Sequence, residues 1–212
     1  MQDYTYYLFD ADGTLFDTTE LIHQCFIYSL KKHFNTDLPR KTILASIGMP
    51  LRTQFEIHLG PLSDDHYDLI QKDHMTYQLS IYKDYIKAFP GVTDTLARLQ
   101  KNKKKLAVVT SRKITTLTLY LEETGLKDFF DILITPDETV QHKPAAEPAL
   151  KAMELLGAEK AQSLFIGDSI FDIQCGTHAG IDTAFVTWSH NDAAALPVTP
   201  TYLINNMLEL CV

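Results

Sequence analysis

Short apolar runs alternate with helix-length amphipathic segments through the second half of the chain. The runs that we expect to form strands are 105–109, 131–134, 163–166 and 182–187, together with a similar run at 4–9. The segments with helical periodicity are 92–103, 113–124, 146–156 and 171–179. Strands that alternate with helices at this spacing predict a parallel sheet with right-handed crossovers. The predicted fold class is therefore α/β.

The stretch 17–84 does not follow this alternation. Segment 20–34 places its apolar side chains on one helical face, segment 64–82 is again helical in pattern, and strand signals are nearly absent between them. We therefore expect an all-helical cap domain at 17–84. It is inserted into a parallel-sheet core that consists of 1–16 and 85–212.

Polar residues follow the predicted strands at the points where the strands end. In chain order they are Asp10 and Asp12, then Thr110 and Ser111, then Lys143, and finally Asp168 and Asp172. Because the carboxyl ends of parallel strands line one crevice, we expect these side chains to converge at one edge of the sheet. For Asp172 the alternative is a capping role at the start of the helix at 171–179.

These groups resemble the four motifs of the haloacid dehalogenase-like hydrolase superfamily, in the same order and over essentially the whole chain. The first reads Asp10-Ala11-Asp12-Gly13-Thr14 and the last Gly167-Asp168-Ser169-Ile170-Phe171-Asp172. The resemblance implies a Rossmann-like core with a helical cap, as the periodicity also indicates. The segment 106–113 (LAVVTSRK) is similar to the phosphoglycolate phosphatase and pyrophosphatase branch.

The resemblance also implies roles for individual residues. Asp10 corresponds to a nucleophile that attacks phosphorus, and Asp12 to the general acid and base. Asp10, the backbone carbonyl of Asp12, and Asp168 correspond to Mg²⁺ ligands, which are the hard oxygen donors that this ion prefers. Asp172 corresponds to a supporting position beside the metal or Lys143.

The phosphate-binding positions by the same resemblance are Thr110, Ser111 and Lys143, and Gly13 permits the tight turn after the first strand. Counting charges, four carboxylates and a phosphate dianion face Lys143 as the one expected cation, which makes a metal ion necessary. In the cap, we regard Arg52 as a possible contact for an anionic leaving group.

The expected function is that of a Mg²⁺-dependent phosphatase acting on a small phosphorylated metabolite through an aspartyl-phosphate. Asp12 argues against dehalogenation, because dehalogenases of this superfamily lack a second motif-one aspartate. One alternative is a β-phosphoglucomutase-like phosphotransferase, although Gly167 stands where mutases usually carry an acidic residue. Another is a catalytically silent protein that binds metal and phosphate. The substrate stays open among phosphoglycolate, pyrophosphate, sugar phosphates and nucleotides.

Composition limits the binding partners and the cellular compartment that we expect for this protein. The formal net charge is −8, which makes nucleic acid an unsuitable partner. Apolar runs fall far short of the ~20 residues that a membrane span needs, and no signal peptide is visible. Three widely separated cysteines, Cys25, Cys175 and Cys211, favour a reducing, cytoplasmic setting. We expect a monomer or a weak homodimer.

Overall fold

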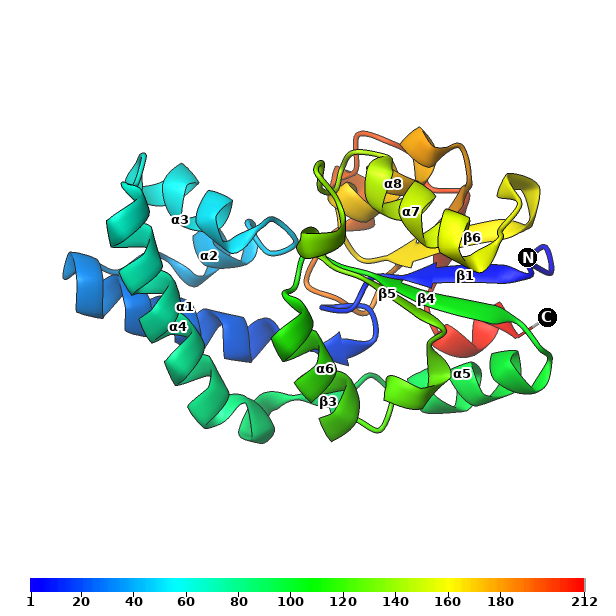
Figure 1. Ribbon diagram of the computed structural model, residues 1–212, viewed down its shortest axis with the longest axis horizontal. Coiled ribbons are helices and arrows are strands. Elements are labelled where there is room, and N and C mark those ends of the chain that lie inside the picture. Colours follow the sequence, from blue (N-terminus) through cyan, green and yellow to red (C-terminus); the bar gives the residue numbers. More distant parts are fainter. Residues whose placement is uncertain (212) are drawn as a thin grey trace. The chain divides into compact units, whose positions relative to one another are not determined.

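The computed structural model describes residues 1–211 and divides into two compact units (Figure 1). One unit is Thr18–Ile86, and the other consists of the chain segments before and after it. Within the described residues, no helix is both long enough and apolar enough to cross a membrane.

The larger unit is built on a parallel six-stranded sheet with the order β5-β4-β1-β6-β7-β8. Its strands are β1 (Tyr6–Phe9), β4 (Lys105–Val109), β5 (Ile132–Ile134), β6 (Ser163–Gly167), β7 (Asp182–Val186) and β8 (Tyr202–Ile204). The α/β fold is confirmed, and the predicted runs correspond to the first five of these strands. The edge strand β8 was not predicted, because three residues are too few to show a periodicity.

Helices cover both faces of this sheet. They are α5 (Val92–Lys101), α6 (Ile114–Glu123), α7 (Glu147–Leu156) and α8 (Ile170–Ala179), with short 3₁₀ turns η1 (Lys127–Phe129), η2 (Pro136–Glu138), η3 (Lys160–Gln162), η4 (Ala193–Ala195) and η5 (Met207–Leu210). In Figure 1, α7 and α8 lie above the sheet and α5 lies below it. Helix α5 ends earlier than the predicted 92–103, because Lys103 adopts a left-handed conformation with φ 59°.

The alternation of side chains along the strands explains this layering. Leu8 of β1 faces α7 and α8, in a buried cluster with Val109 of β4 and Phe165 of β6. Its neighbours Tyr7 and Phe9 point to the opposite face, where their rings stack with centroids 6.3 Å apart. Both faces of the central strand are therefore apolar and buried, as a parallel sheet covered on both sides requires.

The second unit is entirely helical, as the sequence predicts. Its helices are α1 (Thr19–Phe34), α2 (Arg40–Leu44), α3 (Leu51–Leu59) and α4 (Asp64–Tyr85). They enclose a core of their own, in which the rings of Phe26 and Phe55 stack with centroids 4.7 Å apart and Ile70 is fully buried. The apolar face predicted for 20–34 is thus packing within this unit.

Two very short strands lie where the chain leaves and re-enters the sheet unit. β2 (Phe16–Asp17) pairs antiparallel with β3 (Lys87–Ala88), and the amide of Phe89 donates to the carbonyl of Leu15 at 3.0 Å. The sequence analysis predicted no strand at either position. A pair of two-residue strands leaves no periodic pattern, and its register is visible only once the two segments are side by side.

Candidate active site

The loop after β1 carries the first two aspartates and is tightly folded. The amide of Asp10 donates to the carbonyl of Ile166 at 2.8 Å, which fixes the end of β1 beside the end of β6. Gly13 has φ 79°, and a Cβ atom placed there would lie 2.2 Å from Oδ2 of Asp168. Glycine is thus required both by the backbone conformation and by the close approach of a carboxylate.

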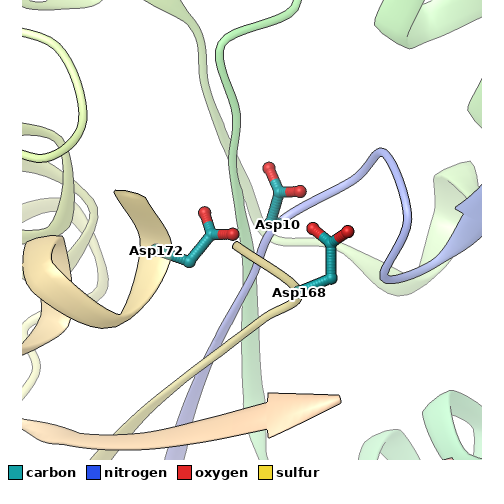
Figure 2. Close-up of side chains that lie close together, drawn as sticks. All are labelled: Asp10, Asp168 and Asp172. Carbon is teal, nitrogen blue, oxygen red and sulfur yellow. The ribbon is translucent and has the colours of Figure 1, made fainter. Parts of the chain in front are cut away.

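Three carboxylates converge at this edge of the sheet. Figure 2 shows Asp10, Asp168 and Asp172 directed toward a common space, and an oxygen from each lies within 4.8 Å of the others. Asp10 follows β1, Asp168 follows β6, and Asp172 lies in the first turn of α8. All three side chains are buried.

Asp172 serves the helix and the cluster at the same time. Its Oδ2 accepts hydrogen bonds from the amide and hydroxyl of Ser169 at 3.0 and 2.6 Å, and the amide of Asp172 donates to the Ser169 hydroxyl at 3.4 Å, which completes the capping box of α8. Its Oδ1 accepts from Lys143 instead. Asp172 therefore caps α8 and contacts Lys143 at the same time. Gly167 permits the close approach, because a Cβ atom there would lie 2.3 Å from that of Asp172.

Lys143 bridges two of the carboxylates through hydrogen-bonded ion pairs. Its Nζ lies 2.6 Å from Oδ1 of Asp10 and 2.6 Å from Oδ1 of Asp172, and it also donates to the carbonyl of Val109 at 3.2 Å. The Lys143 side chain is only 3% exposed. All three donor positions of the ammonium are thus satisfied by groups at the ends of β1, β4 and α8.

Burial and crowding perturb the ionisation of this cluster. Burial, followed by the charge of Asp172, raises the pKa of Asp10 to about 7, although Lys143 acts against this shift. Burial, followed by the charges of Asp172 and Asp10, raises the pKa of Asp168 well above its usual range. Burial disfavours the charged form of Lys143, but Asp10 and Asp172 outweigh it and raise the pKa of its ammonium.

These groups fit a divalent cation. When ionised, the three carboxylates of the cluster outnumber the one ammonium that contacts them, so negative charge remains uncompensated. The donors are all carboxylate oxygens, which hard cations such as Mg²⁺ prefer. The raised pKa values of Asp10 and Asp168 express the same excess of negative charge, which a bound cation would relieve.

Thr110 and Ser111 follow β4 at the same edge. The amide of Thr110 donates to the carbonyl of Ile134 at 3.0 Å, and its hydroxyl accepts a hydrogen bond from the amide of Arg112 at 3.1 Å. Thr110 is buried and Ser111 is half-buried. The structure thus brings the predicted motif-two pair to the strand end that neighbours Asp10.

Among the described residues, Arg112 and Asn191 contact site aspartates and were not singled out in the sequence. Arg112 donates hydrogen bonds to both carboxylate oxygens of Asp12, from Nε at 2.9 Å and from Nη2 at 2.6 Å. The expectation that Lys143 is the one cation of the site is therefore wrong. Asn191, in the loop after β7, donates to Oδ2 of Asp168 at 3.1 Å. A signal for Arg112 existed, since it follows the motif-two pair directly, whereas Asn191 lies in a loop without a pattern.

Comparison with known proteins agrees with this geometry. The family model described as haloacid dehalogenase-like hydrolase matches residues 7–186. The chain belongs to the haloacid dehalogenase-like hydrolase family. Among its relatives, pyrophosphatase PpaX of Oceanobacillus iheyensis is 33% identical over 96% of this chain and 93% of its own length. Pyrophosphatase PpaX of Anoxybacillus flavithermus is 32% identical with the same coverage.

Solved structures share the whole fold with this haloacid dehalogenase-like hydrolase. A protein described as a haloacid dehalogenase-like hydrolase from Bacteroides fragilis is 29% identical, with a TM-score of 0.89 over 98% of this chain and 99% of its own. A protein described as a phosphoglycolate phosphatase from Lactobacillus plantarum has a TM-score of 0.87 over 99% and 98% of the two chains. At 22% identity, the latter likeness concerns the fold alone.

One predicted site residue of this haloacid dehalogenase-like hydrolase lies in the helical unit. Arg52 of α3 pairs with Glu56 at 2.9 Å and with Asp64 at 2.8 Å, and it donates to the carbonyl of Leu62 at 2.8 Å. Its guanidinium also lies 5.1 Å from the centroid of the Tyr67 ring. Its contact with a leaving group stays a prediction, and these partners would compete for its charge.

Proposed function

We propose that this haloacid dehalogenase-like hydrolase is a Mg²⁺-dependent phosphatase of small phosphorylated metabolites, with an aspartyl-phosphate formed on Asp10. The observation that carries the proposal is the buried arrangement of Asp10, Lys143 and Asp168 at adjoining strand ends. Lys143 orients the Asp10 carboxylate through its 2.6 Å contact with Oδ1. A carboxylate fixed in this way beside a cation can attack an electron-poor phosphorus atom.

The reaction has two steps that balance in atoms and charge. In the first, an oxygen of Asp10 forms a bond to phosphorus as the bond from phosphorus to the leaving oxygen breaks, and Asp12 supplies a proton to that oxygen. In the second, Asp12 takes a proton from water as the water attacks the acyl phosphate. Inorganic phosphate departs, and the carboxylate of Asp10 is restored.

The remaining residues hold the transferring group. The hydroxyl of Thr110 and the amide of Ser111 would donate to phosphoryl oxygens, and Lys143 would neutralise part of their charge. Asp10, the backbone carbonyl of Asp12, and Asp168 would hold Mg²⁺, with Asp172 in support. The bound ion supplies charge neutralisation between the attacking carboxylate and the anionic phosphate.

Pyrophosphate is the substrate to test first. The chain is 32–33% identical to pyrophosphatases named PpaX over nearly its whole length. Gly167 also favours hydrolysis over a mutase, since it stands where mutases of this superfamily usually carry an acidic residue. Phosphoglycolate, sugar phosphates and nucleotides complete the panel.

The first experiment measures phosphate release from this panel with and without Mg²⁺, beside the Asp10→Asn variant. We expect Mg²⁺-stimulated turnover that falls by roughly 10³-fold or more in Asp10→Asn. Asp94→Asn, on an exposed position of α5, is the matched control and should stay within twofold of wild type, about the scatter of surface changes. An Asp10→Asn enzyme as active as wild type would refute the assignment of the nucleophile.

A trapping experiment tests the intermediate directly. Acid quenching during turnover of ³²P-labelled substrate should leave label on wild-type protein, and hydroxylamine should release it because an acyl phosphate is susceptible to that nucleophile. Asp10→Asn should carry no label. If no member of the panel releases phosphate and no label is trapped, the catalytically silent metal- and phosphate-binding alternative is favoured instead.

A further inference from the structure

The ion pair between Arg112 and Asp12 is a second charged centre beside the carboxylate cluster. Both guanidinium contacts are short, and the two side chains are only 8% and 14% exposed. Two further contacts steady Arg112, since its Nη1 donates to the hydroxyl of Thr116 at 3.4 Å and its Cζ lies 4.4 Å from the centroid of the Tyr120 ring. A planar guanidinium is thereby held in one orientation.

The role of Asp12 places this pair beside the leaving group of the proposed reaction. A general acid must lie within about 2.6–3.2 Å of the atom that it protonates. If Asp12 has that role, the leaving oxygen lies against its carboxyl group, and Arg112 is the next neighbour. The backbone of Arg112 is also fixed at the site, because its amide donates to the hydroxyl of Thr110.

The geometry of the pair indicates what Arg112 can bind. Its Nε and Nη2 form a parallel fork on the two Asp12 oxygens, and the same fork fits two oxygens of a phosphate group. While both oxygens of Asp12 accept hydrogen bonds from Arg112, the guanidinium competes with the proton that Asp12 must donate or accept. An anionic group on the leaving side would draw the guanidinium from Asp12, whereas a neutral alcohol offers it nothing.

The two cations of the site, Lys143 and Arg112, contact different carboxylates. Lys143 contacts Asp10 and Asp172, on the side of the transferring phosphoryl group, and Arg112 contacts Asp12. A substrate with two adjoining anionic groups could therefore use one cation for each group.

We propose that Arg112 is a specificity-determining residue that recognises a second anionic group on the leaving side of the substrate. The favoured class is then phosphoanhydrides and phosphate esters whose leaving group carries an additional anionic group, with inorganic pyrophosphate as the simplest member. This inference rests on the proposed function. It adds that an arginine of the sheet unit, beside Asp12, selects the leaving group.

The test compares two substrates in Arg112→Met, Arg112→Lys and wild type. The leaving group of pyrophosphate is a phosphate with further anionic oxygens, whereas the leaving group of p-nitrophenyl phosphate carries no anionic group besides its reacting oxygen. In Arg112→Met we expect kcat/KM for pyrophosphate to fall by about 100-fold, in the range for loss of a buried charged contact, and that for p-nitrophenyl phosphate to fall much less. Arg112→Lys should be intermediate, because an ammonium keeps the charge without the fork.

A binding measurement without turnover accompanies the kinetics. Calorimetric titration with methylenediphosphonate, whose P–C–P bridge resists hydrolysis, should show weaker affinity in Arg112→Met, by about tenfold or more. Affinity for phosphate alone should change much less. Arg98→Met removes the same charge from an exposed position of α5 and should match wild type in both assays.

The outcomes separate this inference from the proposed function. Equal losses for both substrates would mean that Arg112 positions Asp12 or supports the fold, and would overturn the inference. No loss for pyrophosphate would overturn it as well. If wild type cleaves both substrates and Asp10→Asn cleaves neither, the chemistry stands whatever Arg112 does. Activity in Asp10→Asn would instead reject the proposed function.

Discussion

Replacing Lys143 by methionine removes the ammonium that bridges two buried carboxylates. Methionine fills a similar volume without a charge, so Asp10 and Asp172 lose contacts of 2.6 Å each. The three side chains are at most 7% exposed, so water cannot replace the lost ammonium. Removing one partner of such a buried pair costs about 3–5 kcal/mol of unfolding free energy. We expect a loss of this size in chelator-treated protein at pH 8.

The loss should shrink at lower pH. Lys143 lowers the pKa of Asp10, which nevertheless lies at about 7, so the variant should have a still higher value. A carboxyl group whose pKa is raised by folding binds a proton that the unfolded chain lacks. Its unfavourable contribution is therefore absent at pH values below the unfolded pKa and grows as pH rises through the folded pKa. The stability of Lys143→Met should fall more steeply from pH 5.5 to pH 8 than that of wild type.

Urea unfolding followed by tryptophan fluorescence measures this effect in the sheet unit alone. Trp188 is the one tryptophan of the chain and belongs to that unit. Lys151→Met is the control, because Lys151 forms a surface pair with Glu154 at 2.9 Å, and its loss should cost less than about 1 kcal/mol. If Lys143→Met and Lys151→Met were equally stable at pH 8, the argument that burial makes the Lys143 contacts important would be refuted.

Two further predictions concern the same cluster. Gly13→Ala should reduce activity by roughly 100-fold or more and lower stability by more than about 1 kcal/mol, because its Cβ atom would meet Asp168 at 2.2 Å. Gly157→Ala, at φ 64° with no atom within 4 Å of its Cβ atom, should keep its activity, and similar activity in both variants would contradict the steric argument. Calorimetry should show Mg²⁺ affinity rising from pH 6 to pH 8 with release of protons, because the pKa of Asp10 is raised to about 7 in the absence of metal; pH-independent binding would exclude Asp10 as a titrating ligand.

The positions of the candidate site residues could be predicted from the sequence because a local pattern marks them. Asp10, Thr110 and Asp168 each follow an apolar run that is buried as a strand. In a parallel sheet such positions must meet at one edge, so a one-dimensional pattern fixes a three-dimensional arrangement. The helical character of 18–86 could be predicted for the same reason, since amphipathic periodicity is a property of neighbouring residues.

Only the tertiary structure decided how these groups are partnered. The pairing of Arg112 with Asp12 joins positions 100 residues apart, and although both follow strand ends, the sequence does not indicate that these two side chains pair. The pairing of β2 with β3 and the addition of β8 to the sheet edge likewise depend on long-range contacts between segments too short to show a pattern. The sequence by itself thus determined the first five strands of the sheet, the helices between them and the carboxylates that follow them. The charge balance of the site arose from packing, because the energy of an ion pair depends on distance and burial in space rather than on separation along the chain.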